Sequence, residues 1–202
     1  MLYPGIEAGE FSCKDYGDYF LYVCRFVPEK DIEFAISAFR IFQRKSRRKF
    51  RLVVAGAAPA QDTPYYSRIR ELSGDGVELC PNAPEDALKA LYSQALCCLY
   101  TPVNEDFGLV PLEGMASCKP CIAKDEGGPR ETVDEGKDGF LVKSPEQMAE
   151  KMLLLANDEG KCERMGKAGR KKVLEKFTWE IFLKRFGKVA KEVADRKMNG
   201  EK

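Results

Sequence analysis

The sequence predicts an α/β protein with a doubly wound, parallel six-stranded sheet and extra C-terminal helices. Short runs rich in β-branched and aromatic residues alternate with segments whose apolar residues recur at helical spacing. Strands that alternate with helices favour a parallel sheet, because each crossover between parallel strands needs a helix. The run Ala95–Tyr100 is nearly all apolar, as expected for a strand covered on both faces.

The expected strands are spaced so that a helix fits between most neighbours. Turn residues mark their ends, as Gly56 does after the second strand. In chain order the strands are expected at Tyr19–Arg25, Phe50–Ala55, Val77–Leu79, Ala95–Tyr100, Cys121–Ala123 and Gly139–Lys143. Ligands of such sheets bind at the carboxyl ends of the strands, so functional residues are expected just after these ends.

Several of the expected helices carry a recognisable signal. Apolar residues at helical spacing mark the first, Pro84 stands at a favoured first-turn position, and Thr178 is a good N-cap for the last. The helices are expected at Asp31–Arg47, up to about Leu72, from Pro84, at Phe107–Ser117, from Gly127 through Val133, at Pro145–Asn157, at Asp158–Lys176 and after Thr178.

Composition bounds the class of protein. A length of 202 residues fits one domain, or one domain with a small appendage. The 33 basic and 32 acidic residues nearly cancel, which argues against nucleic acid as a partner. No apolar run reaches the length that spans a bilayer, and no signal peptide is recognisable. The absence of histidine excludes mechanisms in which a histidine of this chain acts.

Eight cysteines raise the question of redox state. Four of them lie in or beside expected strands, where Cys behaves as a small hydrophobe: Cys24, Cys97, Cys98 and Cys121. A secreted disulfide scaffold would be shorter and poorer in regular structure. We therefore expect a reduced, cytoplasmic protein.

The segment Glu105–Glu113 is the most informative one, because two carboxylates flank a Phe-Gly-Leu turn just after the fourth strand. If a helix starts at this turn, its free N–H groups and its dipole favour an anion. Each carboxylate can accept hydrogen bonds from vicinal hydroxyls, so the pair would hold two sugar rings. Gly108 lets a ligand approach the backbone. Two ordinary helical acids are the alternative, which leaves the turn unexplained.

Two further segments point to the same ligand. Arg25 and Lys30 flank the end of the first strand and would hold a diphosphate through charge-assisted hydrogen bonds; two surface charges are the alternative. Gly127 and Gly128 form a turn that would shape the floor of a sugar pocket. No Asp-X-Asp pair occurs, so we expect no metal and no cofactor in the site.

Two other motifs have plain interpretations. The pair Cys118 and Cys121 has the spacing of a redox dithiol, but it lies between an expected helix end and a strand start, where a dithiol lacks a helix dipole to activate it. The basic segment Arg44–Arg51 is interpreted as a solvated helix end, with an anionic membrane surface as the minority alternative.

Together these residues resemble the C-terminal, donor-binding domain of the retaining glycosyltransferases of family 4 (glycosyl transferases group 1), which have the two-domain GT-B fold with Rossmann-like halves. The resemblance covers nearly the whole chain. Its blocks are Tyr3–Ile6, which resembles the interdomain hinge, Arg25–Lys30, Glu105–Glu113, Gly127–Glu131 and Phe177–Trp179. It implies a hinge segment at 1–18, a nucleotide-sugar-binding domain at 19–177, and a helix at 178–202 that packs toward an N-terminal domain.

The resemblance also implies roles for residues. Arg25 and Lys30 would stabilise the leaving diphosphate, and Glu105 would contact the donor sugar; these are the expected catalytic residues. The expected substrate-binding residues are Phe107, Gly108, Leu109, Glu113, Gly56, Gly127 and Gly128, with Glu113 on the ribose hydroxyls.

Function follows as an expectation. The chain is expected to be the donor-binding half of a metal-independent hexosyltransferase, incomplete without an N-terminal, acceptor-binding domain on the same or a separate chain. The context Tyr100–Glu105 is similar to mannosyltransferases that build lipid-linked oligosaccharides, which implies mannose and a peripheral membrane contact through a lipid-linked acceptor. Cys80–Asn82 stands where the family usually has Gly beside the nucleobase, so the base stays open. The alternatives are a stand-alone nucleotide-binding module, a sugar-nucleotide epimerase of the same fold and a thiol redox protein.

Overall fold

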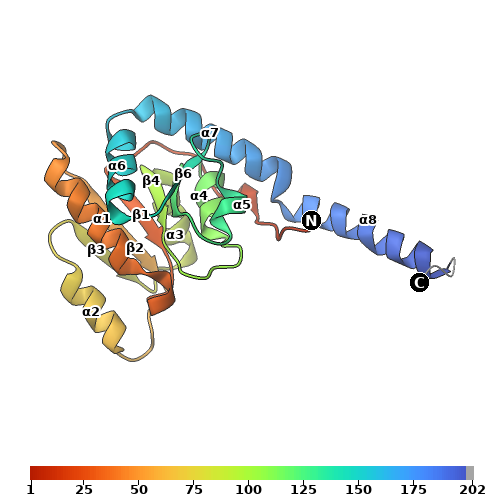
Figure 1. Cartoon of the computed structure of the whole chain (residues 1–202), viewed down its shortest axis with the longest axis horizontal. Coiled ribbons are helices and arrows are strands. Elements are labelled where there is room, and N and C mark those ends of the chain that lie inside the picture. The colour runs from red at the N-terminus through yellow and green to blue at the C-terminus, as the bar shows by residue number, and fades with distance from the viewer. Residues whose placement is uncertain (199–202) are drawn as a thin grey trace.

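The computed structural model, which describes residues 1–198, contains the expected six-stranded parallel sheet (Figure 1). The strand order is β3-β2-β1-β4-β5-β6, so β1 and β4 lie side by side in the middle. The strands are β1 Tyr19–Val23, β2 Arg51–Gly56, β3 Val77–Pro81, β4 Cys97–Tyr100, β5 Cys121–Lys124 and β6 Gly139–Val142. The predicted fold class is confirmed.

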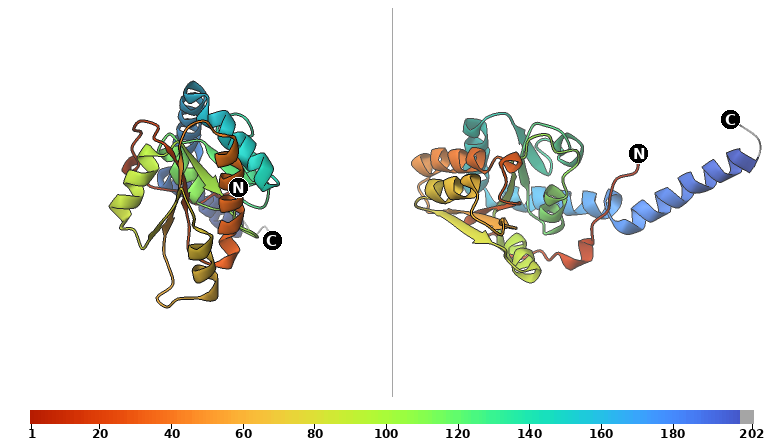
Figure 2. Two further views of the ribbon diagram at one scale, coloured as in Figure 1. Left: turned by 90° about the vertical axis from the view of Figure 1, so that its left-hand side faces the viewer. Right: turned by 90° about the horizontal axis from the view of Figure 1, so that it is seen from below.

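Helices cover both faces of the sheet (Figure 2). Helix α1 packs against α2 and α6, while α4 packs against α3 and α7. The helices are α1 Ile32–Lys45, α2 Pro64–Leu72, α3 Glu85–Gln94, α4 Val110–Ala116, α5 Pro129–Thr132, α6 Pro145–Ala156, α7 Glu159–Lys176 and α8 Trp179–Met198, with short 3-10 turns η1 Ala8–Glu10 and η2 Pro28–Lys30. All expected helices are present.

The core is centred on β1 and β4. Both strands are apolar because each is buried on both faces, and all four residues of β4 are buried. On the α1 side the Phe20 ring meets Phe42 edge to face at 5.0 Å and Phe50 at 5.7 Å. Such aromatic pairs stabilise the fold beyond the area that they bury.

One helix starts later than the sequence suggests. The prediction places its start at Phe107, but α4 begins at Val110. Gly108 has a φ of +77°, which lies outside the right-handed helical region. Residues 107–109 therefore form a turn that leads into α4, with Leu109 as its N-cap residue, and the predicted start at Phe107 is three residues too early.

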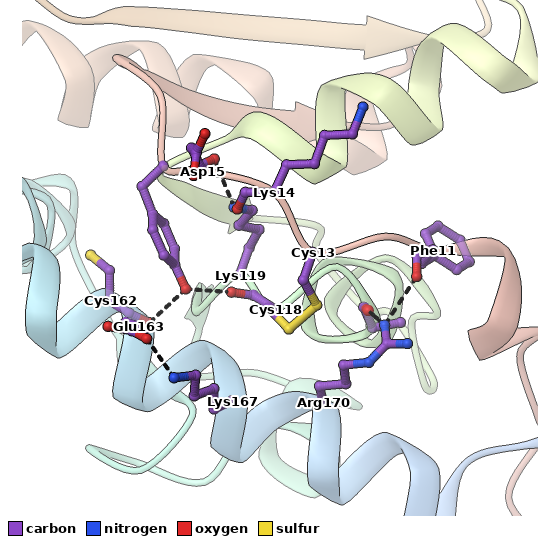
Figure 3. Close-up of a disulfide and its surroundings, with 12 residues drawn as sticks. Phe11, Cys13, Lys14, Asp15, Cys118, Lys119, Cys162, Glu163, Lys167 and Arg170 are labelled. Atoms are coloured by element: carbon purple, nitrogen blue, oxygen red, sulfur yellow. Dashed lines mark hydrogen bonds and ion pairs between the residues drawn. A yellow bond between two sulfur atoms is a disulfide. The ribbon is translucent and has the colours of Figure 1, made fainter.

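The N-terminal segment 1–18 runs along the body and is tied to it at several points. The amide of Ile6 donates to the carbonyl of Phe177 at 2.9 Å. Further along, the Tyr16 hydroxyl donates to the carbonyl of Cys118 at 2.8 Å, and the Lys119 amine donates to the carbonyls of Lys14 and Asp15 at 2.9 and 3.1 Å (Figure 3). The segment thus has a fixed path.

A disulfide corrects our expectation of a fully reduced protein. Cys13, in the N-terminal segment, is bonded to Cys118, which follows α4 (Figure 3). Cys121 is a free cysteine buried in β5, which contradicts the minority alternative of a Cys118–Cys121 dithiol. The physical reason is that Cys121 belongs to the sheet core, whereas Cys118 lies at a helix end that faces Cys13. The four strand cysteines are buried and free, as predicted.

Helix α8 leaves the body instead of packing on it (Figures 1 and 2). It carries a row of exposed apolar side chains, among them Leu183 at 62% and Phe186 at 51% exposure. The predicted C-terminal segment 178–202 is described as helix to Met198, and residues 199–202 lie outside the described residues. Across residues 1–198, no helix combines the length and the hydrophobicity that crossing a bilayer requires.

Candidate functional site

The site lies at the topological switch point of the sheet. From β1 the chain continues to β2 on one side, and β4 continues to β5 on the other side. The loops after β1 and β4 therefore run to opposite sides at the carboxyl edge, which is the place where doubly wound sheets bind ligands. The residues predicted from the sequence follow these two strands.

Lys30 and Glu105 meet at this edge of the sheet. The Lys30 Nζ lies 2.5 Å from Glu105 Oε2, and the two side chains are 15% and 29% exposed. One residue follows β1 and the other follows β4, so 75 residues of sequence separate the partners. A cation and a hydroxyl acceptor are thus held together at the predicted place.

The backbone at Lys30 is held by buried hydroxyls. The Tyr22 hydroxyl donates to the carbonyl of Lys30, and the Thr101 Oγ1 donates to the same carbonyl at 3.1 Å and to that of Asp31 at 2.9 Å. Burial raises the pKa of Tyr22 well above its ordinary value, so the hydroxyl remains a donor. These contacts fix the position from which the Lys30 side chain extends.

Arg25 and Gly56 lie at the same edge but differ from the expected pattern. Arg25 is exposed and takes part in no ion pair within residues 1–198. A Cβ on Gly56 would lie 2.2 Å from the carbonyl oxygen of Cys24, at a φ of +132°. Gly56 therefore has a packing role, which lets the ends of β1 and β2 approach each other.

Gly108 is required by the protein itself. A Cβ at this position would lie 2.3 Å from the hydroxyl oxygen of Tyr100. Burial raises the pKa of Tyr100, and the charge of Glu105 raises it further. The hydroxyl beneath the loop is therefore neutral. The ring of Phe107 is stacked on Tyr3 at 5.4 Å, which joins the loop to the N-terminal segment. Leu109 is exposed.

The turn at Gly127 and Gly128 packs directly on the Glu105 loop. A Cβ on Gly127 would lie 2.3 Å from the carbonyl oxygen of Glu105, and one on Gly128 would lie 2.1 Å from that of Phe107. The Gly128 amide donates to the Glu105 carbonyl at 2.9 Å. The two predicted motifs are therefore one structural unit, and the glycines permit the contact between their backbones.

Glu113 belongs to a separate pocket beside this unit. The pocket has a volume of about 500 Å³ and is lined by residues of the N-terminal segment, β1, α3, α4 and Trp179. The Tyr92 hydroxyl donates to Glu113 Oε2 at 2.6 Å. Burial raises the pKa of Glu113, and the hydrogen bond from Tyr92 opposes this rise. Lys30 and Glu105 do not line this pocket, so the predicted carboxylates occupy adjoining parts of the edge.

Sequence reasoning missed Lys124 and Tyr92. Lys124 ends β5, and its amine lies 3.3 Å from Asp31 and 3.5 Å from Glu126. Its position at a strand end was a signal that could have been used. Tyr92 gave no such signal, because a tyrosine on the inner face of a helix is usually part of the core. Among residues 1–198, no three His, Cys, Asp or Glu side chains are grouped so that they could hold a metal ion.

Comparison with known proteins identifies similar sequences and folds. The family model for glycosyl transferases group 1 matches residues 12–172. The alpha-1,3/1,6-mannosyltransferase ALG2 of Dictyostelium discoideum is 29% identical over 192 residues, which cover 87% of this chain and 46% of the relative. The chain therefore spans about half the length of this curated relative.

Solved structures agree on the architecture. Sucrose-phosphate synthase from Thermosynechococcus elongatus superposes with a TM-score of 0.83 at 26% identity, over 95% of this chain and 52% of that one. Anabaena HepE in complex with UDP superposes with a TM-score of 0.84 at 16% identity, over 95% of this chain and 57% of that one. The second likeness is one of fold alone.

Proposed function

The chain belongs to the glycosyl transferases group 1 family, and on this premise we propose that it is the nucleotide-sugar-binding half of a hexosyltransferase. In this proposal Lys30 and Arg25 hold the diphosphate of the donor. Glu105 accepts hydrogen bonds from the transferred sugar, and Glu113 accepts them from the ribose. The amides of residues 107–109 line the path between the two rings.

The contact between Lys30 and Glu105 carries this proposal. A diphosphate attached to a hydroxylated ring needs both a cation and a hydrogen-bond acceptor. Here the Lys30 amine can bind the phosphate, and the Glu105 carboxylate can accept hydrogen bonds from the hydroxyls. When the ligand enters, the Lys30 amine exchanges Glu105 for a phosphate oxygen. The freed carboxylate oxygen of Glu105 then accepts from the sugar.

The chemistry of transfer is part of the proposal. Cationic side chains stabilise the negative charge that develops on the leaving diphosphate, which supports transfer without a metal. The mannosyltransferase name of the Dictyostelium relative supports mannose as the sugar, and the resemblance to family 4 supports retention of configuration. The UDP bound by Anabaena HepE supports a nucleoside diphosphate as part of the ligand.

A second domain completes the enzyme in this proposal. In it, the acceptor is held by that domain and reaches the sugar at the carboxyl edge of the sheet. The exposed apolar side chains of α8 support a helix that packs on another domain, because a row of such residues in water is unfavourable. Cytoplasmic location and contact with a membrane through a lipid-linked acceptor remain predictions.

Calorimetry with UDP, GDP and ADP tests the binding step. We expect one nucleoside diphosphate to bind, with the same affinity in Mg²⁺ and in EDTA. Lys30→Ala and Arg25→Ala should each weaken its binding by about 1.5–3 kcal/mol, the scale of a hydrogen bond to a charged group. Lys137→Ala, which removes a side chain that is 69% exposed and lies at the Asp134 turn, is the matched control.

Two results would contradict the proposal. Binding of none of the three nucleotides would remove its basis. Loss of binding in EDTA would assign the diphosphate to a metal instead of to Lys30 and Arg25. Transfer is tested by supplying an N-terminal domain of a relative together with donor and acceptor. Binding without transfer in that assay would favour the alternative of a stand-alone binding module.

A further inference from the structure

We propose that Tyr92 of α3 positions the Glu113 carboxylate for hydrogen bonds with the ribose, and thereby determines how this site binds the nucleoside. The inference rests on the proposed function, since it assigns a ribose to the pocket of Glu113. The inference goes beyond the proposed function because it names a residue outside the strand-end loops that determines how tightly the nucleoside is bound.

Among residues 1–198, the Tyr92 side chain has one polar partner. Its side chain is 2% exposed, and its hydroxyl donates to Glu113 Oε2 at 2.6 Å. The Phe11 ring meets the Tyr92 ring edge to face at 5.8 Å, which holds the ring in place. A buried phenol with a single acceptor fixes the orientation of that acceptor, because loss of the bond would leave a polar group unsatisfied.

The bond leaves Glu113 able to act on a ligand. An ionised carboxylate accepts at about four sites, and Tyr92 occupies one of them. Glu113 lines the pocket of about 500 Å³, so its other acceptor sites are available to a ligand bound there. With its rotation fixed, the carboxylate presents these acceptors to two neighbouring hydroxyls without first losing side-chain freedom.

The charge of Glu113 depends on the same bond. Burial raises its pKa and the Tyr92 hydroxyl opposes the rise, so the bond helps to keep the acceptor ionised. Burial raises the pKa of Tyr92 well above its ordinary value, so the hydroxyl stays protonated. The other titratable groups that line this pocket are Glu7 and Glu10 of the N-terminal segment, and Glu85 and Lys89 of α3. Cys98 of β4 is buried near Glu113; burial raises its pKa to about 12, and the charge of Glu113 acts in the same direction. The Lys89 amine is paired with Glu10 and Glu85, at 2.6 and 2.7 Å.

Three variants test the inference: Tyr92→Phe, Glu113→Gln and the double variant. Binding of UDP, GDP and inorganic pyrophosphate is measured by calorimetry between pH 5 and pH 8. Tyr92→Phe should weaken the binding of the nucleoside diphosphate by about fivefold to twentyfold, as expected when one hydrogen bond to a charged group is lost. It should leave the affinity for pyrophosphate unchanged. In the Glu113→Gln background the same change should have little further effect, because the two residues act together.

The pH dependence separates positioning from packing. In Tyr92→Phe the pKa of Glu113 should rise, so the loss of nucleotide affinity at acid pH should begin at a higher pH than in the wild type. A ¹³C NMR titration of the Glu113 carboxyl measures this shift without any ligand. Tyr19→Phe is the matched control, since it removes a buried hydroxyl that donates at 2.6 Å to the carbonyl of Leu91 in the same helix.

The outcomes distinguish the two proposals. If the wild type binds neither UDP nor GDP, the proposed function fails and this inference fails with it. If the wild type binds and Glu113→Gln weakens binding, but Tyr92→Phe changes neither affinity nor the Glu113 titration, only the positioning role is overturned. Equal weakening by Tyr19→Phe and Tyr92→Phe would assign the effect to α3 packing and would also overturn it.

Discussion

Gly108 shows how a single residue serves both the fold and the site. It adopts a left-handed conformation, and it lies against the hydroxyl of Tyr100. A side chain here would therefore be strained by the backbone and would also push on a buried ring. The loop that holds Glu105 and Phe107 keeps its shape only with glycine at this position.

Gly108→Ala should destabilise the protein through both effects. The comparison is Gly136→Ala, because Gly136 has a similar φ of +74° but no atom within 4 Å of the point where a Cβ would lie. We expect about 1–2 kcal/mol of lost unfolding free energy for Gly136→Ala from backbone strain. Gly108→Ala should lose about 1–3 kcal/mol more through crowding against Tyr100.

Urea unfolding of both variants measures this difference. Adding Tyr100→Phe to Gly108→Ala should recover part of the loss, since it removes the hydroxyl that lies closest. Equal losses for the two glycine variants would show that Tyr100 does not constrain the loop.

Within the described part of the chain, Lys119 is a buried amine whose hydrogen bonds all go to backbone carbonyls. It is fully buried, it lies 3.9 Å from the centre of the Tyr16 ring, and burial lowers its pKa to about 8. A lysine whose folded pKa is below its unfolded value stabilises the protein above the unfolded pKa. This contribution is lost as the pH falls through the folded pKa, so stability should rise between about pH 8 and pH 10.5.

Lys119→Met should remove this pH dependence. Between pH 7 and pH 9.5 the wild type should gain about 2 kcal/mol relative to the variant, since one pKa unit corresponds to about 1.4 kcal/mol. Urea unfolding of both proteins at the two pH values checks the difference. A constant gap between the two proteins would show that Lys119 keeps an ordinary pKa in the folded state.

At the scale of elements, one buried ion pair joins α7 to the segment between α5 and β6. The Lys172 amine lies 2.5 Å from Asp138 Oδ2 and donates to the carbonyl of Thr132, the last residue of α5, at 2.5 Å. Asp138 is fully buried. Helix α5 follows the turn of Gly127 and Gly128, so the Lys172 contacts hold α7 against the helix that comes after this turn.

Lys172→Met should destabilise the protein by about 3–5 kcal/mol, because it leaves a buried carboxylate without its partner. Burial already raises the pKa of Asp138, and loss of Lys172 should raise it further. A raised carboxyl pKa means stability that is present at low pH and lost as the pH rises. The loss should therefore be greater at pH 8 than at pH 5.

The neighbouring Lys171→Met provides the control, since the Lys171 side chain is 76% exposed. Chemical unfolding at both pH values should show little change for Lys171→Met, and Asp138→Asn should partly restore Lys172→Met. A loss below about 1 kcal/mol for Lys172→Met would mean that water reaches Asp138 and replaces the amine.

The sequence predicted the elements well because strand and helix patterns are local. The buried run of β4 and the Pro and Thr residues at helix starts were sufficient for that purpose. The site was predicted in part, since residues that follow parallel strands meet at one edge. The features that could not be predicted depend on residues that are far apart in the sequence but close in space. The partner of Cys13 lies 105 positions away, and no spacing in the sequence marks it.

At the scale of the whole molecule, the disulfide joins the N-terminal segment to the end of α4. It closes a loop between two cysteines that are 105 positions apart in the sequence. A cross-link of this length restricts the unfolded chain strongly, and the chain-entropy estimate for such a loop is about 4.7 kcal/mol. The tyrosine and lysine contacts beside it hold the same segment without a covalent bond.

Cys13→Ser should lower the unfolding free energy by up to about 4–5 kcal/mol. Dithiothreitol should lower the urea midpoint of the wild type to a similar degree and leave the variant unchanged. Alkylation of the denatured wild type should label six cysteines before reduction and eight after it. Eight labelled cysteines before reduction, with no effect of dithiothreitol on the midpoint, would show that Cys13 and Cys118 remain thiols.

The hydrogen bond between Ile6 and Phe177 brings both ends of the folded body to a single point. A domain whose two ends are neighbours can be inserted into another protein. Residues 6–177 could be inserted into a surface loop of a host protein through two short linkers, without separating the strands of the host. The same adjacency would let the original ends be joined and new ones opened elsewhere, which makes the domain suitable for circular permutation.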